Sequence, residues 1–288
     1  MLEFDNVSFF YGNEAVFKNF SCNLNENEVT GILGHSGCGK TTFLELACGI
    51  LKPFSGTVTP FSAKSPSFIF QEDRLLPWKT ALENLTFTGI SPKRAKEYLC
   101  KTGLASSEDK FPDELSGGMS RRLSVARALA FGGDCFFIDE PLHGLDIKTS
   151  DEVLSVIDSE ICGKTALVIT HSPEEAFRLC DRIIVAEGPP FRISADFKKS
   201  DFESPEAFKT ALKKSYKVKP FVLRQRALFF IKSLRRTFYK APLPHRSKRI
   251  LPFCPPRLQC PPRLLLRPLP QDRSCCRDKR KNPRFQAL

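Results

Sequence analysis

Residues 34–42 read GHSGCGKTT and combine three glycines with one lysine and two threonines. They match the pattern G-x-x-x-x-G-K-[ST] through Gly34, Gly39, Lys40 and Thr41, and they follow the apolar run VTGIL. Glycines keep side chains away from the backbone N–H groups, so such a loop can wrap closely around a chain of phosphates. The pattern predicts a phosphate-binding loop, with a plain glycine turn as the structural alternative.

In this loop we expect Lys40 to reach the β- and γ-phosphates of ATP and the Thr41 hydroxyl to hold Mg²⁺. The helix that begins near Lys40 points its positive end at the phosphates. The remaining predicted phosphate contacts come from His35, Ser36, Gly37, Cys38 and Thr42.

Two adjacent carboxylates end the apolar stretch CFFIDEP at residues 135–141. Asp139 emerges at the end of this buried strand, where it can bind Mg²⁺ through water. Glu140 suits a general base that polarises water for attack on the γ-phosphate. An ordinary acidic strand end is the alternative, and the phosphate loop in the same chain favours the catalytic interpretation.

A second phosphate cradle is predicted in LSGGMSRRLSVARALA, residues 115–130, where a serine and two glycines open a long helix. The free N–H groups of a helix N-terminus bind phosphate. One chain does not need two cradles for one nucleotide. We therefore expect this second cradle to close on ATP that another copy of the chain holds.

With these motifs in this order, the sequence resembles an ABC-type ATPase, the nucleotide-binding subunit of ABC transporters, over about residues 1–195. The resemblance implies that Ser116, Gly117 and Gly118 contact the γ-phosphate of the opposite subunit. It also implies that Asp146, in the stretch HGLD, lies at the dimer seam.

The resemblance assigns roles to three further side chains. Tyr11 would stack on adenine, with a half-buried strand aromatic as the alternative. Gln71, which ends the strand SFIFQ, would contact Mg²⁺ and the attacking water. His171, which ends ALVITH, would contact the γ-phosphate, although a lone histidine at a strand end is more often structural.

Two positions depart from the family pattern. Met119 replaces the glutamine that usually follows LSGG, and we expect reduced rather than lost function because Ser116 and both glycines remain. His143 and Gly144 stand where the family more often has Ser-Ala, a change that would retune the dimer seam.

The stretch FQEDRLLPWKTALENL, residues 70–85, resembles importer ATPases for nitrate, sulfonate, taurine and related small organic solutes. In that subfamily the segment meets a coupling helix of the permease. Internal packing of Leu75, Leu76, Pro77 and Trp78 is the alternative. The transported solute is not encoded here, because a separate binding protein and the permease select it.

The elements that must position these motifs alternate along the chain. Residues 2–25 alternate apolar and polar side chains and predict two antiparallel strands with a turn near Gly12 and Asn13. From residue 29 onward, short apolar strands alternate with helices, which favours a parallel sheet wrapped by helices.

The predicted fold class is therefore α/β. The resemblance refines it to a P-loop NTPase of the ABC type, with a RecA-like core, an antiparallel β subdomain and an α-helical subdomain at about 72–130. We expect the ATP-binding domain to cover residues 1–195 and a short helical extension to cover 196–216. A basic tail at 217–288 would follow.

The C-terminal quarter differs from the rest in composition. Residues 217–288 hold 20 of the 44 Lys and Arg residues but 2 of the 32 Asp and Glu residues, so their net charge is +18 and that of residues 1–216 is −6. This quarter also holds eleven of the 22 prolines and has no sustained helical or strand period. We predict that it is disordered.

Within the tail, residues 226–240 read RALFFIKSLRRTFYK and have the pattern of a basic amphipathic helix at a membrane surface. A solvated basic tail without a role is one alternative, and a run-on or frameshifted reading frame is another. The cysteines divide in the same way, because seven of eleven lie in 1–216, mostly in apolar runs such as those around Cys48, Cys100, Cys135 and Cys180. We interpret these seven as small buried hydrophobes in a reducing compartment.

As a transporter ATPase, the chain would bind integral-membrane permease subunits and a second ATPase subunit, as a homodimer, and would act indirectly with an extracytoplasmic solute-binding protein. We expect no nucleic-acid partner. The N-terminus carries no secretory signal, and no apolar stretch reaches the roughly 18 residues of a membrane span. The expected location is peripheral, at the cytoplasmic face of the cell membrane.

A soluble ABC ATPase of DNA repair or translation is the alternative function. Such proteins usually carry two cassettes in one chain or a long coiled-coil insertion, whereas this chain has one phosphate loop, one LSGG and no heptad run. A non-enzymatic basic adaptor whose tail binds anionic lipid or RNA is a further alternative. Loss of such binding on deleting 217–288 would support a role for the tail without displacing the ATPase core.

Overall fold

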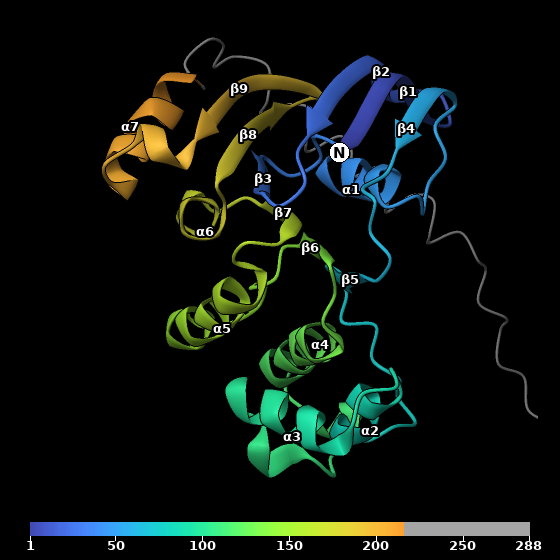
Figure 1. Ribbon diagram of the computed structural model, residues 1–288, viewed down its shortest axis with the longest axis vertical. Helices are drawn as coiled ribbons and strands as arrows, with labels where there is room; N and C mark the ends of the chain where they lie inside the picture. The colour runs from blue at the N-terminus through green and yellow to red at the C-terminus, as the bar shows by residue number, and fades with distance from the viewer. Residues whose placement is uncertain (216–288) are drawn as a thin grey trace, which may run out of the picture. The chain divides into compact units, whose positions relative to one another are not determined.

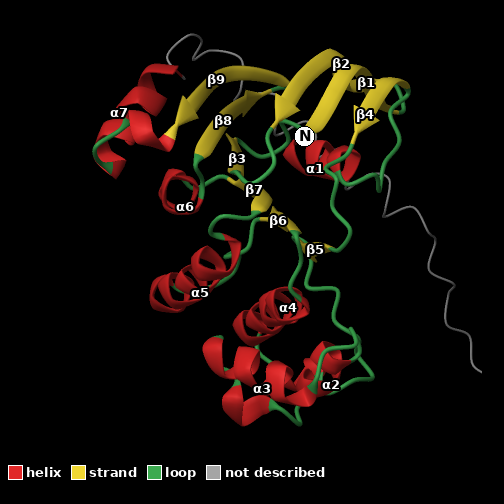
Figure 2. Ribbon diagram, in the orientation of Figure 1, coloured by secondary structure: helices red, strands yellow, loops and turns green. Residues whose placement is uncertain are grey.

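The computed structural model describes residues 1–215, which form two sheets and the helices around them (Figures 1 and 2). The disorder predicted for the basic tail and the amphipathic pattern of 226–240 lie outside the described residues. The strands are β1 (Leu2–Tyr11), β2 (Glu14–Leu24), β3 (Val29–Gly34), β4 (Ser55–Thr59), β5 (Pro66–Ile69), β6 (Cys135–Asp139), β7 (Thr165–Thr170), β8 (Arg182–Glu187) and β9 (Arg192–Lys198).

The smaller sheet is antiparallel and has the order β2-β1-β4. β1 pairs with β2 so that Tyr11 lies opposite Glu14, which confirms the predicted turn at Gly12 and Asn13. β4 adds a third strand on the other side of β1. The sequence did not indicate β4, because this short strand is almost entirely exposed and lacks an apolar alternation.

The larger sheet has the order β5-β6-β7-β3-β8-β9, and its first five strands run parallel. β3, β6 and β7 are buried at every position. Burial on both faces explains their continuous apolar runs and confirms the predicted parallel sheet.

β9 pairs antiparallel with β8 at the edge of this sheet and was not predicted. Its residues alternate between exposed and half-buried, so it lacks the apolar run that marked the other strands. β9 also occupies residues 196–198, the start of the segment expected to be helical. The turn η3 (Lys199–Asp201) and the helix α7 (Pro205–Ser215) follow it.

The remaining helices are α1 (Lys40–Ala47), α2 (Ala81–Thr86), α3 (Pro92–Lys101), α4 (Gly117–Phe131), α5 (Ile147–Ile161) and α6 (Pro173–Leu179), with the short turns η1 (Ala105–Ser107) and η2 (Pro112–Glu114). α1 ends at Ala47 rather than at the predicted Leu51, because Gly49 takes a positive φ of 77°.

Helices α2, α3 and α4 pack together below the sheets in Figure 1. Thr80, Ser91 and Ser116 cap them, each accepting a hydrogen bond from the backbone N–H three residues later. Such a cap stabilises a helix by about 1 kcal/mol. α4 also packs against β5, so it connects these helices to the larger sheet.

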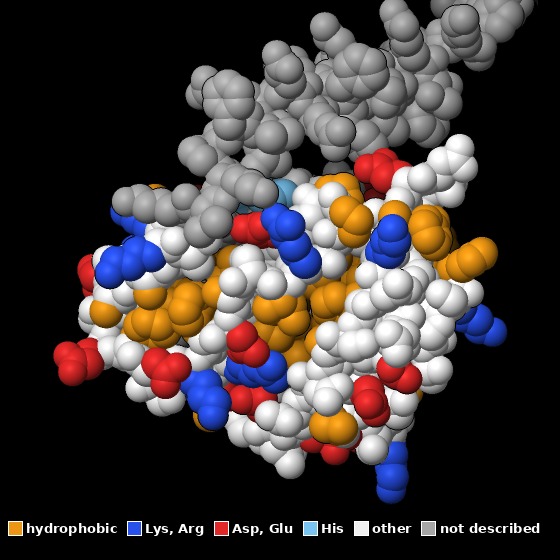
Figure 3. Space-filling model, turned by 90° about the horizontal axis from the view of Figure 1, so that it is seen from above, with side chains coloured by type: hydrophobic (Ala, Val, Ile, Leu, Met, Phe, Trp, Pro, Cys, Tyr) orange, Lys and Arg blue, Asp and Glu red, His pale blue; other side chains and the backbone are white. Residues whose placement is uncertain are grey.

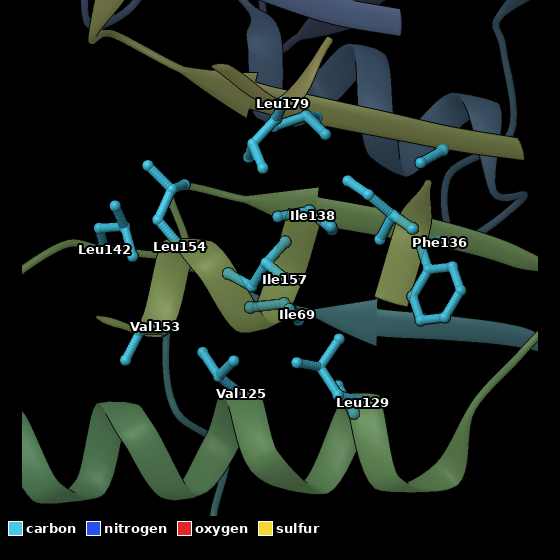
Figure 4. Close-up of a cluster of buried hydrophobic side chains, with 14 of the residues drawn as sticks. Ile69, Val125, Leu129, Phe136, Ile138, Leu142, Val153, Leu154, Ile157 and Leu179 are labelled. Atoms are coloured by element: carbon cyan, nitrogen blue, oxygen red, sulfur yellow. The ribbon is translucent and has the colours of Figure 1, made fainter. Parts of the chain in front are cut away.

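Two clusters of buried hydrophobic side chains hold the elements together. In the first, Ile69, Leu129, Ile138 and Ile157 lie between the strands β5 and β6 and the helices α4 and α5 (Figure 4). The second joins β1 and β2 to α1 through stacked and edge-on aromatic rings. Its rings belong to Phe4, Phe17, Phe20, Phe43 and Phe191.

The cysteine prediction is correct in part. Three are buried (Cys38, Cys135 and Cys180), whereas two are half-buried (Cys22 and Cys48) and two are exposed (Cys100 and Cys162). α3 buries Ala95, Tyr98 and Leu99, so Cys100 falls on its outer face. All seven cysteines of residues 1–215 are free thiols.

The face seen from above in Figure 3 carries acidic and basic side chains around hydrophobic patches. No continuous basic stripe crosses the described residues of this face. Among residues 1–215, no helix combines the length and the apolar character needed to cross a bilayer.

Replacing Phe136 by alanine should lower the free energy of unfolding by about 3–5 kcal/mol, because this ring is fully buried in the first cluster. Phe54, which is 81% exposed, provides a matched control, and its change to alanine should alter stability by no more than about 0.5 kcal/mol. Urea unfolding of the full chain, followed by circular dichroism, measures both. Equal effects would contradict the position of Phe136 in the core.

Candidate active site

The predicted site residues meet at one edge of the larger sheet. β5, β6, β7 and β3 are parallel neighbours, so their carboxyl ends lie side by side. The phosphate loop follows β3, His171 follows β7, Glu140 follows β6, and Gln71 lies two residues after β5. The structure therefore brings together, in one row, residues that are far apart in the sequence.

The loop between β3 and α1 depends on glycine for two physical reasons. Gly37 and Gly39 have φ values of 81° and 102°, a region that residues with a side chain rarely adopt. A Cβ on Gly34 would lie 2.6 Å from the carbonyl oxygen of Ala186, so the loop approaches β8 too closely for any side chain. The loop conformation thus fits the predicted close wrapping of phosphates.

Lys40 is buried inside this loop and is only 6% exposed. Its Nζ donates to the carbonyl oxygens of Gly34 at 2.9 Å and His35 at 3.0 Å. Cys38 and Thr42 are buried as well. We therefore expect these two residues to meet a phosphate through their backbone N–H groups rather than through their side chains.

A hydrogen bond joins Thr41, in the first turn of α1, to Asp139 at the end of β6. Thr41 Oγ1 donates to Asp139 Oδ2 at 2.9 Å. Asp139 is 3% exposed, and its other oxygen, Oδ1, has no hydrogen-bond partner among the described residues. Burial raises the pKa of this carboxyl group above its ordinary value, while the hydrogen bond from Thr41 lowers it.

Glu140 follows β6 in an unusual backbone conformation, with a φ of 45°. Its N–H donates to the carbonyl oxygen of Ile169 in β7 at 2.9 Å. Its carboxylate lies between two histidines, with Oε1 3.3 Å from His171 Nδ1 and Oε2 3.9 Å from His143 Nδ1. The predicted pair Glu140 and His171 is therefore adjacent, and His143 is an additional neighbour.

The sequence did not point to Glu175, which anchors the loop that carries His171. Thr170 Oγ1 donates to Glu175 Oε2 at 2.7 Å and accepts from the N–H of Ser172 at 3.0 Å. Burial raises the pKa of the Glu175 carboxyl group, and the hydrogen bond from Thr170 lowers it. The sequence signal that could have indicated Glu175 was its position four residues after His171, in the first turn of α6.

The sequence also gave no role to Arg121, which is 3% exposed. Its guanidinium donates to carbonyl oxygens of both Glu140 and Gln71. Arg121 lies one helical turn before the buried Val125 in α4, so the helical period alone would have placed it on the buried face.

Tyr11 and Gln71 have exposed side chains. Tyr11, at the end of β1, is 53% exposed and makes an edge contact with the ring of Phe9. The hairpin that carries Tyr11 packs on the phosphate loop, since a Cβ on Gly39 would lie 3.0 Å from Val16 Cγ1. The contact with this loop thus comes from Val16 in the second strand of the hairpin, and the ring of Tyr11 is exposed at the end of the first.

The predicted second cradle begins α4. Ser116 Oγ accepts from the N–H of Met119 at 3.3 Å, and the Met119 side chain packs against the first hydrophobic cluster. Space is open around Gly117, where an added Cβ would meet no atom within 4 Å. The replacement of glutamine by Met119 therefore leaves the helix cap intact.

The two cradles do not combine within one chain. Figure 1 draws α1 and α4 on opposite sides of β6. No hydrogen bond in the described part of the chain joins residues 116–118 to residues 34–42. Asp146 caps α5 by accepting from the N–H of Thr149 at 3.1 Å, and the neighbouring Ile147 is 86% exposed.

Comparison with known proteins places this arrangement in a family. The sequence pattern of the ABC transporter family matches residues 17–143. The chain is 35% identical over 228 residues to the bicarbonate transport ATP-binding protein CmpD of Synechocystis sp., a match that covers 71% of this chain and 80% of that protein. The chain belongs to the ABC transporter ATP-binding proteins.

Two other similarities agree with this. The chain is 34% identical over 207 residues to the aliphatic sulfonates import ATP-binding protein SsuB 3 of Paraburkholderia xenovorans, covering 70% of this chain and 82% of that protein. It also resembles a dimeric structure of the ATP-binding cassette MJ0796, in a post-hydrolysis state bound to ADP and Pi, with 29% identity and a TM-score of 0.62 over 69% of this chain and 99% of that chain.

The chain is therefore an ABC-type ATPase that is similar to the ATP-binding proteins of importers. The predicted fold class is confirmed, including the antiparallel β subdomain beside the parallel core. The resemblance to importer ATP-binding subunits is confirmed as well.

In Glu175→Gln we expect a higher free energy of unfolding at neutral pH, because the amide oxygen keeps the hydrogen bond from Thr170 without burying a charge. The folded-state pKa of Glu175 is raised, so the wild-type carboxyl group stabilises the fold below its ordinary pKa of 4.5 and loses this contribution as pH rises through the folded-state pKa. The advantage of the variant should therefore disappear in acid.

Urea unfolding of both proteins at acid and at neutral pH measures this difference. Glu174→Gln is the matched control, because a hydrogen bond from Lys209 lowers the pKa of that exposed neighbour. It should show no gain at neutral pH. A gain for Glu175→Gln that does not change with pH would contradict the electrostatic cause.

Proposed function

We propose that this protein hydrolyses ATP at the row of strand ends described above and thereby drives an ABC importer for a small solute. The observation that supports this most directly is the alignment of Lys40, Thr41, Asp139, Glu140 and His171 at one edge of the larger sheet. Such a row supplies a phosphate cradle, a cation site and a proton acceptor at one edge of the sheet.

In this proposal, Lys40 and the loop around it bind the β- and γ-phosphates of ATP. Glu140 accepts the proton of the water that attacks the γ-phosphate, and His171 orients the Glu140 carboxylate and contacts the same phosphate. Gln71 holds the attacking water. Tyr11 stacks on adenine with its exposed ring.

Mg²⁺ fits the residues that are present. Asp139 offers a buried carboxylate oxygen without a partner beside the Thr41 hydroxyl, and Gln71 adds an amide oxygen. These three residues would hold the cation together with the phosphates. When bound, it neutralises charge on the β- and γ-phosphates. Residues 1–215 contain no cluster of three His, Cys, Asp or Glu side chains that could hold a metal without the nucleotide.

The site is completed by a second copy of the chain in this proposal. Ser116, Gly117 and Gly118 of one subunit contact the γ-phosphate bound by the other, and Asp146 lies at the seam. The open space at Gly117 and the exposed Ile147 beside Asp146 support such a contact. The MJ0796 cassette, which this chain resembles, is dimeric in its solved structure.

Residues 70–85 are the proposed contact with the permease. Leu75 packs against the first hydrophobic cluster, whereas Trp78 is 69% exposed and the following helix leaves Phe87 68% exposed. The predicted alternative of internal packing therefore applies to Leu75 and not to Trp78. An exposed indole and phenyl ring are suited to an apolar partner helix.

The proposed solute belongs to the class of nitrate, sulfonate and taurine. The similar proteins CmpD and SsuB 3 are named for the transport of bicarbonate and of aliphatic sulfonates, and both solutes are small anions. We place the protein peripherally at the cytoplasmic face of the membrane, bound to permease subunits that receive the solute from an extracytoplasmic binding protein. Closure on ATP and reopening after hydrolysis would drive alternating access.

Glu140→Gln should lower kcat for ATP hydrolysis by about 100- to 10,000-fold, because the amide cannot accept the proton of the attacking water. ATP binding should persist, so gel filtration of the variant should show a shift to dimer when ATP is added. Phosphate release measures the rate, and Glu152→Gln, on the exposed face of α5, serves as control. A persistent monomer with bound ATP would argue against the composite site or against tolerance of Met119.

Lys40→Ala should raise the Kd for ATP at least about tenfold, which corresponds to a loss of about 1.4 kcal/mol. The change removes the buried ammonium that lies within the phosphate loop. Titration calorimetry with ATP measures the affinity. Lys52→Ala, at an exposed lysine beyond α1, should bind ATP like the wild type, and equal affinity of both variants would exclude the predicted loop as the phosphate site.

A further inference from the structure

Arg121 contacts the end of β6 with three of its hydrogen bonds. Its Nη2 donates to the carbonyl oxygens of Asp139 at 3.1 Å and Glu140 at 2.7 Å, and its Nε donates to that of Pro141 at 2.9 Å. Three consecutive carbonyl groups thus converge on one cation. They belong to the peptide units that carry the proposed cation ligand and the proposed proton acceptor.

The same guanidinium contacts the loop after β5. Its Nη1 donates to the carbonyl oxygens of Phe70 at 2.6 Å and Gln71 at 3.3 Å, and to the Asp73 carboxylate at 3.3 Å. One side chain from α4 therefore bridges two neighbouring strand ends, each of which carries a predicted site residue.

The Glu140 peptide needs such support. Its φ of 45° lies in the left-handed region, which is unfavourable for a residue with a side chain because the Cβ approaches the following carbonyl oxygen. Converging carbonyl dipoles would also repel one another without a cation between them. Arg121 offsets both effects. Its own burial lowers the pKa of the guanidinium, and the hydrogen bond to the Asp73 carboxylate opposes this shift in part.

We propose that Arg121 is a positioning residue that fixes the backbone of Glu140 and of Gln71 in one shared geometry, so that both side chains meet the same water. This inference rests on the proposed role of Glu140 as proton acceptor. Among the described residues, Arg121 itself makes no hydrogen bond to the phosphate loop. Its loss should therefore slow the chemical step and leave ATP binding largely intact.

Only arginine has the donors that this bridge requires. A guanidinium carries five N–H groups in a planar fork, whereas glutamine offers two donors and lysine a single ammonium point. Glutamine can thus bond to one strand end, and lysine can restore the charge but not the fork. Arg121→Gln should lose most of the positioning, and Arg121→Lys should keep part of it.

Two other arginines that donate hydrogen bonds to backbone carbonyl groups provide controls. Arg127, on the same helix, donates to the carbonyl oxygens of Asp73 and Arg74 and so holds the loop after β5 without touching Glu140. Arg94 donates to the carbonyl oxygen of Ala130 at the far end of α4. Arg127→Gln tests loop anchoring alone, and Arg94→Gln tests the loss of an arginine–carbonyl bond away from the site.

The experiment measures steady-state kcat and KM by phosphate release, and the Kd for ATP by titration calorimetry, on the full-length variants. We expect kcat of Arg121→Gln to fall by about 100-fold, as for a small misplacement of a catalytic group, with the Kd for ATP within about threefold of wild type. The kcat of Arg121→Lys should lie between those of Arg121→Gln and the wild type. The kcat of Arg127→Gln should fall less than that of Arg121→Gln, and the kcat of Arg94→Gln should equal that of the wild type.

Several results would overturn the inference. They are an unchanged kcat in Arg121→Gln, an equal loss in Arg127→Gln, or a parallel loss of kcat and ATP affinity. If urea unfolding shows that Arg121→Gln does not fold, Arg121→Lys becomes the deciding variant. A kcat of Arg121→Lys equal to that of the wild type would then reject the proposal. Glu140→Gln, measured alongside, separates the two hypotheses, because full hydrolysis by that variant would reject the proposed function itself.

Discussion

The hydrogen bond between Thr41 Oγ1 and Asp139 Oδ2 joins residues that are 98 positions apart, and it depends on one constraint, the parallel register of three buried strands. In that register, Leu33 of β3 lies beside Thr170 of β7, and Asp139 of β6 lies beside Ile169. A shift of one residue would turn every side chain of a strand to the other face of the sheet. The apolar cores on both faces prevent this shift, and so they set the geometry of the site.

The site contains a buried polar group and a backbone conformation that are both energetically unfavourable. Asp139 keeps a buried oxygen without a partner in the described residues, and Glu140 keeps a left-handed backbone. Such costs persist where the surroundings determine the conformation. Here the surroundings are β7, whose Ile169 carbonyl oxygen accepts a hydrogen bond from the Glu140 N–H, and Arg121, which donates to three successive carbonyl oxygens.

α4 connects two proposed functions of the protein. Its first residues form the cap with Ser116, its second turn carries Arg121 to the strand ends, and its apolar face packs on β5. A movement of α4 would therefore shift the second cradle, the Gln71 loop and Glu140 together. The helix that the sequence marked as a phosphate cradle is thus also a structural support of the chemical step in the same chain.

The sequence by itself indicated the phosphate loop, the Asp139–Glu140 pair and the alternation of strands and helices, because glycine patterns, strand-end acids and apolar periods are local signals. His171 had no such signal and was indicated only by the family resemblance. Tertiary structure decided the elements and residue roles that have no local signal in the sequence. The exposed β4 and the edge strand β9 form only through pairing with β1 and β8. Arg121 and Glu175 acquire their roles only when distant carbonyl and hydroxyl groups reach them, since a buried polar side chain must find partners wherever the fold supplies them.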